Sequence, residues 1–218
     1  MLTKQALQDF LRDQWNIVVD LHISLRNMTR LTESKYDHEE QVKRHGYFKH
    51  HWYQLKFIAV IQVAKLFSER KNDARSFSKL CNLLDTSPYD DALKTALEEN
   101  SRSSIIAHTR EDIKQIVDRT RQSLSSNSAL ILKFLNARDK VYAHKDSGLG
   151  VPIPSVEEIG LMTKLSAQIQ NDFNFNIFFT STPFEESKSW DIDYVLFYMS
   201  ELRKKDLEEL ERKKKGGT

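Results

Sequence analysis

The sequence has little cysteine, glycine or proline, and little net charge. Its single cysteine, Cys81, excludes a disulfide within the chain and is typical of a reducing compartment. Six glycines and four prolines among 218 residues favour a mostly helical chain with few tight turns. The net charge of +2 argues against attraction of nucleic acid to the molecule as a whole, so any basic surface has to be local.

Long apolar runs are also missing. The longest near-continuous run, Phe57 to Ala64, is interrupted by Gln62 and falls far short of the roughly 20 residues that cross a bilayer. No apolar signal core follows the first residues, Met1 to Gln5. We therefore expect a soluble, cytoplasmic protein with no membrane partner.

Apolar residues recur at steps of three and four along most of the chain, which indicates amphipathic helices and an all-α fold. Helices are predicted at about 7–31, 41–68, 77–86, 90–99, 110–124, 129–146, 155–174 and 187–214. The density of apolar residues in the second of these predicts that it is largely buried. No strand is convincing, although residues 173–180 could pass for one. Residues 187–218 are predicted to form a charged C-terminal helix that packs on the rest of the chain or on a partner.

The most informative segment ends a strongly apolar helical run. It contains Arg138, the directly following carboxylate Asp139, and His144 six residues after the arginine. Two other arginines precede a histidine at a similar spacing, at 44–50 and 102–108, but neither has an adjacent acid. Spacing alone would arise by chance about once in this sequence, so the acid and the helical context distinguish the segment at Arg138.

Helix geometry limits how these residues can meet. In a regular α-helix, residues six apart differ by about 240° in direction and by about 9 Å along the axis. Arg138 and His144 of one intact helix would therefore not share a face. Either the helix unwinds before His144, or a twofold dimer brings two arginines and two histidines into one cleft.

An arginine, an acid and a histidine are suited to cleaving RNA without a metal ion. Histidine can take or give a proton near neutral pH, and a 2′-hydroxyl that has lost its proton can attack the adjacent phosphate. Arginine stays charged and can bind two phosphate oxygens as charge develops on them. Asp139 could hold either partner in place. DNA lacks the attacking hydroxyl, so RNA is the expected substrate.

The segment Arg138 to Asp146 resembles the arginine–polar–spacer–histidine motif of the HEPN superfamily (higher eukaryotes and prokaryotes nucleotide-binding). Ala143-His144-Lys145-Asp146 is similar to its abortive-infection branch, as is the pattern of helices from Trp52 to Leu84. The resemblance implies an up-down helical bundle over residues 1–186 with additional N- and C-terminal helices. It also implies a homodimer with a composite site, metal-independent endoribonuclease activity, and a role in phage defence or toxin–antitoxin pairs. Arg138, Asp139 and His144 are the residues carried over.

One departure concerns the antitoxin. HEPN toxins that a partner nucleotidyltransferase modifies carry a tyrosine two residues after the histidine, where this sequence has Asp146. That mode of inhibition is therefore not implied, although an antitoxin or another defence partner is. An alternative function is a non-catalytic helical module that binds RNA or a defence-system partner.

Four further basic residues are weaker candidates for RNA contact: Lys140, Lys145, Arg44 and His50. The histidines at 45, 50 and 51 could suggest a metal site, but no two of them are spaced four apart and no His-Glu-x-x-His order exists. Neither a glycine-rich phosphate loop nor a Gly-x-Ser-x-Gly elbow is found. We therefore expect no metal and no cofactor.

Overall fold

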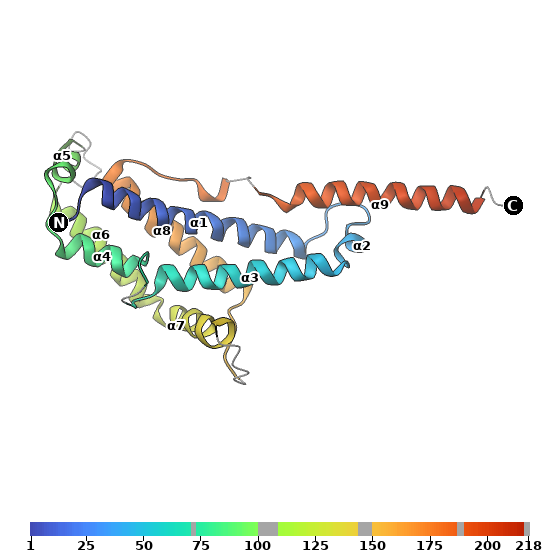
Figure 1. Cartoon of the computed structure of the whole chain (residues 1–218), viewed down its shortest axis with the longest axis horizontal. Coiled ribbons are helices and arrows are strands. Elements are labelled where there is room, and N and C mark those ends of the chain that lie inside the picture. Colours follow the sequence, from blue (N-terminus) through green and yellow to red (C-terminus); the bar gives the residue numbers. More distant parts are fainter. Residues whose placement is uncertain (71–72, 100–108, 144–149, 187–189, 216–218) are drawn as a thin grey trace.

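The structure, a computed structural model, confirms the all-α prediction (Figure 1). It describes residues 1–70, 73–99, 109–143, 150–186 and 190–215, and for 141–143 the backbone only. Its helical elements are α1 (Lys4–Thr32), α2 (Glu39–Lys43), α3 (Gly46–Phe67), α4 (Phe77–Thr86), α5 (Asp91–Glu99), α6 (Arg110–Ser126), α7 (Ser128–Asn136), the π-helix η2 (Ala137–Ala143), α8 (Val156–Phe178), the 3-10 turn η3 (Phe184–Glu186) and α9 (Ile192–Lys215). In these ranges no helix is long and apolar enough to cross a membrane.

Side-chain caps begin several helices where the sequence offers a short polar residue. The Ser155 hydroxyl accepts a hydrogen bond from the backbone N–H of Glu158, whose carboxylate in turn accepts from the Ser155 N–H at 2.7 Å. Thr109 and Asp112 form the same reciprocal box at the start of α6. Each box satisfies N–H groups that the first helical turn leaves unpaired, and so fixes where the helix begins.

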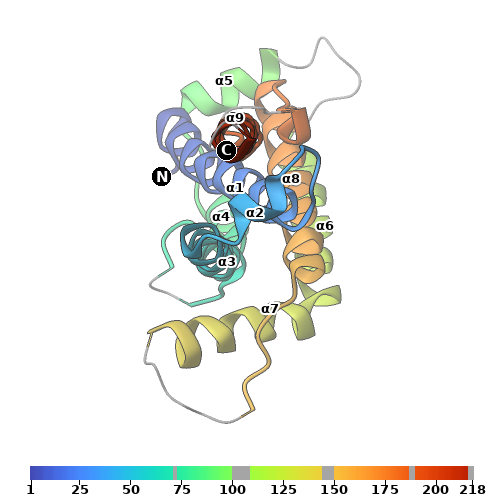
Figure 2. The same cartoon turned by 90° about the vertical axis from the view of Figure 1, so that its right-hand side faces the viewer.

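Helix α1 lies at the centre of the bundle, between α3 and α8 (Figure 2). Its Leu7, Val18 and Leu21 are fully buried because their spacing places them on one face of the helix. At the C-terminal end of α3, the ring of Phe67 packs edge to face against that of Phe77 in α4, with centroids 5.3 Å apart. The helix expected as an N-terminal addition to the bundle is therefore a main part of the core.

The helix predicted over residues 41–68 is two helices, and this part of the prediction was wrong. The chain breaks at Arg44 and His45, between α2 and α3, and the His45 ring accepts a hydrogen bond from the Tyr47 N–H to cap α3. The prediction that this helix is largely buried was also wrong for its first half, where Tyr47 and Tyr53 are more than half exposed. Apolar density indicated a buried helix, but α3 buries one face only.

The stretch from Phe173 to Thr180, which could pass for a strand, is instead the end of a helix. Helix α8 continues to Phe178 and ends where Phe179 adopts a left-handed conformation, with φ of 54°. Phe173 and Ile177 are fully buried and lie four residues apart, so they face the core together.

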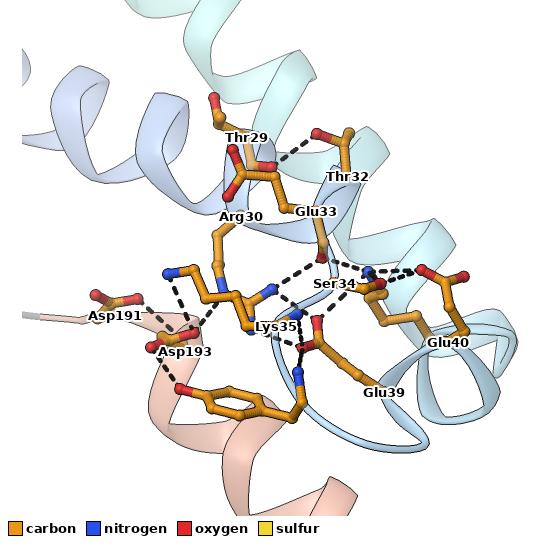
Figure 3. A network of polar contacts seen from close by, with 12 residues as sticks. Thr29, Arg30, Thr32, Glu33, Ser34, Lys35, Glu39, Glu40, Asp191 and Asp193 are labelled. Carbon is orange, nitrogen blue, oxygen red and sulfur yellow. Dashed lines mark hydrogen bonds and ion pairs between the residues drawn. The ribbon is translucent and has the colours of Figure 1, made fainter.

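A buried cluster of charges joins α1, α2 and α9 (Figure 3). The guanidinium of Arg30, whose side chain is only 4% exposed, donates to both carboxylate oxygens of Glu39 at 2.6 and 2.8 Å. It also donates to Asp193 at the start of α9. The Tyr36 hydroxyl donates to the second oxygen of Asp193 at 2.9 Å. One arginine near the end of α1 therefore fixes the positions of two other helices.

The pKa of Glu39 shows how tightly this cluster is held. Burial alone would raise the pKa of its carboxyl group. Hydrogen bonds from Arg30 and from the backbone N–H groups of Lys35 and Tyr36, together with the charge of Arg30, outweigh burial and lower the pKa to about 2. The carboxylate of Glu39 therefore stays ionised at any pH well above this value.

Replacing Glu39 by alanine leaves Arg30 charged and buried without its main partner. We expect Glu39→Ala to lower the free energy of unfolding by about 3 kcal/mol, measured by urea denaturation. The matched control is Glu40→Ala, which removes a neighbouring carboxylate that is 68% exposed and should change stability by less than about 0.5 kcal/mol. Equal effects of the two substitutions would show that the cluster does not hold the three helices together.

Candidate functional site

The segment carrying the predicted motif is not a regular α-helix. Helix α7 ends at Asn136, and Ala137–Ala143 continues as η2, in which the backbone hydrogen bonds span five residues instead of four. Short π-helical turns of this kind are frequent at functional sites. The difference of about 240° between residues six apart in an α-helix therefore does not apply to this segment. His144 and Lys145, two of the predicted site residues, lie outside the described residues.

Arg138 and Asp139 form a chain of ion pairs with two residues of the α3–α4 connection, Arg70 and Asp73. The Arg138 Nε donates to Asp139 Oδ1 at 2.8 Å, and its Nη1 donates to Asp73 Oδ2 at 3.3 Å. The other Asp139 oxygen accepts from Nη2 of Arg70. Two guanidinium groups and two carboxylates therefore alternate in the order Asp73, Arg138, Asp139, Arg70.

Exposure differs along this chain. The Arg138 side chain is 14% exposed, whereas that of Arg70 is 60% exposed. Arg138 Nη2 makes no hydrogen bond to any of the described residues. Arg138 is thus held in one orientation by two carboxylates and still has donor capacity, while Arg70 presents a second positive charge at the surface beside it. Such a pair could bind the two free oxygens of a phosphate group.

The pKa of Asp139 reflects its two arginine partners. Burial alone would raise the pKa of this carboxyl group, but hydrogen bonds and charge from Arg138 and from Arg70 outweigh burial, and the pKa is lowered. Asp139 is therefore an anion at neutral pH and an acceptor only. In this state Asp139 can position Arg138, but it is a poor proton donor.

Sequence reasoning did not find Arg70 or Asp73. Both lie in the polar break at 69–74, which has no spacing relation to the motif about 65 residues later in the chain. Packing of α7 and η2 against α3 brings the two segments together. A contact of this kind leaves no periodic signal in one sequence.

The other predicted RNA-binding residues occupy two places. Lys140 is exposed on η2, close in sequence to Arg138. Arg44 is exposed at the end of α2 and His50 on the first turns of α3, whereas Arg70 follows the other end of α3. Because the 22 residues of α3 span about 33 Å, the structure does not bring Arg44 or His50 to the Arg138 chain.

A pocket of about 720 Å³ opens between the end of α3 and helices α4, α6 and α7. Glu69, which precedes Arg70, and Leu135, which lies three residues before Arg138, are both part of its lining. Apolar side chains form much of the wall, and Arg121 and Asn82 add polar groups. The pocket therefore adjoins the ion-pair chain and could receive a flat group next to a bound phosphate.

The clustered histidines of α2 and α3 have structural contacts instead. His45 caps α3, and the ring of His51 stacks on Tyr47 with centroids 5.9 Å apart. Across the ranges that the structure describes, no three side chains of the kinds that bind metals lie close enough together to hold an ion.

Comparisons with protein-family models, with curated proteins and with solved structures gave no match.

Removing the outer arginine tests whether the ion-pair chain exists in solution. We expect Arg70→Gln to raise the pKa of Asp139, because one of the two guanidinium groups that stabilise its carboxylate is lost. The pKa can be followed by NMR titration of the carboxyl carbon. The control is Arg75→Gln, which removes an arginine paired with Asp13 from the same connection. An Asp139 pKa that responds equally to both substitutions, or to neither, would contradict the arrangement.

Proposed function

We propose that the chain is a HEPN-type endoribonuclease that cleaves RNA without a metal ion. We further propose that it acts in the cytoplasm of a prokaryote, in phage defence or as the toxin of a toxin–antitoxin pair. The single observation that carries the proposal is Arg138, oriented by Asp139 on a π-helical turn that leads directly into His144 in the sequence. The HEPN type and the role of His144 come from the resemblance of this segment to the HEPN motif.

In the proposed reaction, the RNA 2′-hydroxyl attacks the neighbouring phosphorus and the bond to the 5′-oxygen breaks. One base removes the proton from the 2′-hydroxyl, and one acid gives a proton to the departing 5′-oxygen. The products are a 2′,3′-cyclic phosphate and a 5′-hydroxyl. Arg138 would bind the phosphate oxygens whose negative charge increases in the transition state, and Asp139 would keep the guanidinium in place.

Two proton transfers favour a composite site. When both proton transfers occur in one concerted step, a single imidazole cannot remove one proton and give the other, so a second proton-transfer group is needed. A homodimer with twofold symmetry would supply His144 from each copy, one as base and one as acid. The exposed side chain of Arg70 would add positive charge near the scissile phosphate, and the pocket beside Leu135 would accommodate a flanking base.

The contact of Arg138 with Asp73 favours a second candidate function. In the structure, the charge of Arg138 is already balanced by two carboxylates, as it would be in a purely structural ion-pair chain. A non-catalytic helical module that binds RNA or a defence partner would need nothing more from this residue. The two candidates differ in whether RNA is cut.

The direct test is cleavage of cellular RNA by the purified protein in the presence of a chelator. We expect Arg138→Ala and His144→Ala each to reduce the cleavage rate by roughly 10²-fold or more, because each removes a group that acts in the transition state. Arg12→Ala is the control, since this arginine is 67% exposed on α1. Circular dichroism of each variant checks that the fold is kept.

If the wild-type protein leaves the RNA intact under conditions where a dimer is present, the proposed endoribonuclease activity is contradicted. Cleavage that persists in both Arg138→Ala and His144→Ala would show that another site is responsible.

Asp73 gives a second prediction, because a phosphate has to compete with its carboxylate for Arg138. We expect Asp73→Asn to bind a single-stranded RNA oligonucleotide about fivefold more tightly, equivalent to about 1 kcal/mol for a partly exposed ion pair. Asp91→Asn changes the net charge equally at a carboxylate that is 99% exposed on α5, and it should have little effect. Fluorescence anisotropy measures both affinities, and equal affinities for the two variants would contradict a phosphate site at Arg138.

A further inference from the structure

Two walls of the pocket beside Leu135 lead to the ion-pair chain of Arg138. One wall is the end of α3, where Phe67 and Glu69 line the pocket and Arg70 follows directly. Arg138 comes one turn after the other wall, where α7 passes into η2. This second wall is one face of α7, because its lining residues recur at steps of three and four: Ser128, Ile131, Leu132 and Leu135.

The apolar side chains of the pocket are suited to a flat, uncharged ring. Leu132 is 56% exposed and Leu135 is partly buried, while Phe67, Leu124 and Ile131 also line the pocket with buried side chains. Contact of Leu132 with water is unfavourable, and a ring packed against it would remove that contact. A base that has left the stack of a single RNA strand presents such a flat face.

The polar groups at one side of the pocket are oriented by hydrogen bonds. Arg121 of α6 donates from Nη1 to Asp85 Oδ2 at 3.0 Å and from Nη2 to Asn82 Oδ1 at 3.2 Å. The amide oxygen of Asn82 is therefore directed at the guanidinium, and its NH₂ group donates to none of the residues that the structure describes. Both Arg121 and Asn82 line the pocket. They provide N–H donors, since a guanidinium has more of these than the two bonds use.

Glu69 provides the opposite kind of group. It lines the pocket from the end of α3, is exposed, and forms no ion pair with another described residue. A carboxylate only accepts hydrogen bonds, whereas the hydroxyls of Ser78, Ser125 and Ser128 can either donate or accept. The pocket thus combines fixed donors from α4 and α6 with an acceptor from α3.

Guanine has the matching pattern of donors and acceptors. Its N7 and O6 atoms are adjacent acceptors, and its N1–H and 2-amino groups are adjacent donors. Adenine places an amino group beside N7, where it would face the donors of Asn82 and Arg121. Uracil has no amino group for a carboxylate, and cytosine offers one where guanine offers two neighbouring donors.

We propose, as an extension that rests on the proposed nuclease function, that this pocket recognises guanine and directs cleavage to a phosphate beside a guanosine. Asn82 and Arg121 donate to O6 and N7 of the base, and Glu69 accepts from N1 and the 2-amino group. The phosphate next to this nucleoside then lies at Arg138 and Arg70, because both walls of the pocket lead there.

Calorimetric titration with mononucleotides tests recognition of the base without any cleavage. The wild-type protein should bind guanosine monophosphate about tenfold more tightly than the adenosine, cytidine or uridine monophosphate, each supplied as the 3′- and as the 5′-phosphate. Equal affinities for all of these nucleotides would overturn the proposal.

Asn82→Asp is the sharpest variant, since it keeps the oxygen that Arg121 binds and replaces the donating NH₂ group with a second oxygen. It should abolish the preference for guanosine over adenosine monophosphate. The ratio of the two affinities is the readout, because an added negative charge weakens binding of any phosphate. Gln168→Glu adds the same charge at an exposed position of α8 outside the pocket and should leave the ratio unchanged. A ratio that Asn82→Asp does not lower would overturn the role of this donor.

The acceptor is tested in the same way. Glu69→Gln should reduce the preference for guanosine monophosphate, because its amide can accept from one guanine donor but presents its own N–H groups to the other. Glu111→Gln removes the same charge at an exposed position of α6 outside the pocket and should not change the preference. Equal ratios for these two variants would contradict the contact with Glu69.

Mapping of cut sites separates the guanine pocket from the nuclease. An RNA oligonucleotide with a single guanosine should be cut beside that residue, and replacing the guanosine by adenosine should slow cleavage by about tenfold or more. Equal cleavage of the two would overturn the guanine pocket and leave the nuclease standing. If neither is cut, the proposed nuclease fails, and the nucleotide affinities decide whether the pocket binds guanine.

Discussion

The buried guanidinium of Arg30 is the interaction on which the arrangement of the helices depends. It joins the end of α1, the central helix of the core, to Glu39 of α2 and Asp193 of α9, and Glu39 has no exposed side-chain surface. Charges buried to this extent are unfavourable unless every partner is present, so alternative positions of α2 or α9 are strongly disfavoured. The direction in which α9 leaves the bundle follows from this cluster.

The second group of charges, around Arg138, has a different character. It also alternates arginines and carboxylates, but Arg70 is largely exposed and Arg138 keeps a donor that no described residue uses. In the cluster of Arg30, the Arg30 and Glu39 side chains are at most 4% exposed and bind each other through two hydrogen bonds. An ion-pair chain that is open at one end holds an arginine in position and can exchange a carboxylate for a phosphate. This contrast is the physical reason why we propose a phosphate contact at Arg138 and none at Arg30.

How far the sequence predicts the molecule depends on whether a feature is local. The scarcity of glycine and proline and the three- and four-residue spacing of apolar residues were sufficient to predict the all-α fold, including the short helix α4. The break between α2 and α3 was not predicted, because the apolar residues of α3 continue close to its start. A single histidine cap, at His45, marks the break. The partners of Arg138 were missed because they lie about 65 residues earlier in the chain, and the Arg30–Asp193 contact spans 163 residues. Contacts at such separations depend on tertiary packing, which periodicity does not report.

We propose that Arg138 and His144 act together on RNA through attack by the 2′-hydroxyl. The most direct measurement is mass spectrometry of the products formed from an RNA oligonucleotide in chelator, beside the same oligonucleotide with a 2′-deoxy sugar at the cleaved position. We expect a 2′,3′-cyclic phosphate on the upstream product and no cleavage of the 2′-deoxy substrate. Products that end in a 3′-hydroxyl, or cleavage that does not need the 2′-hydroxyl, would contradict it.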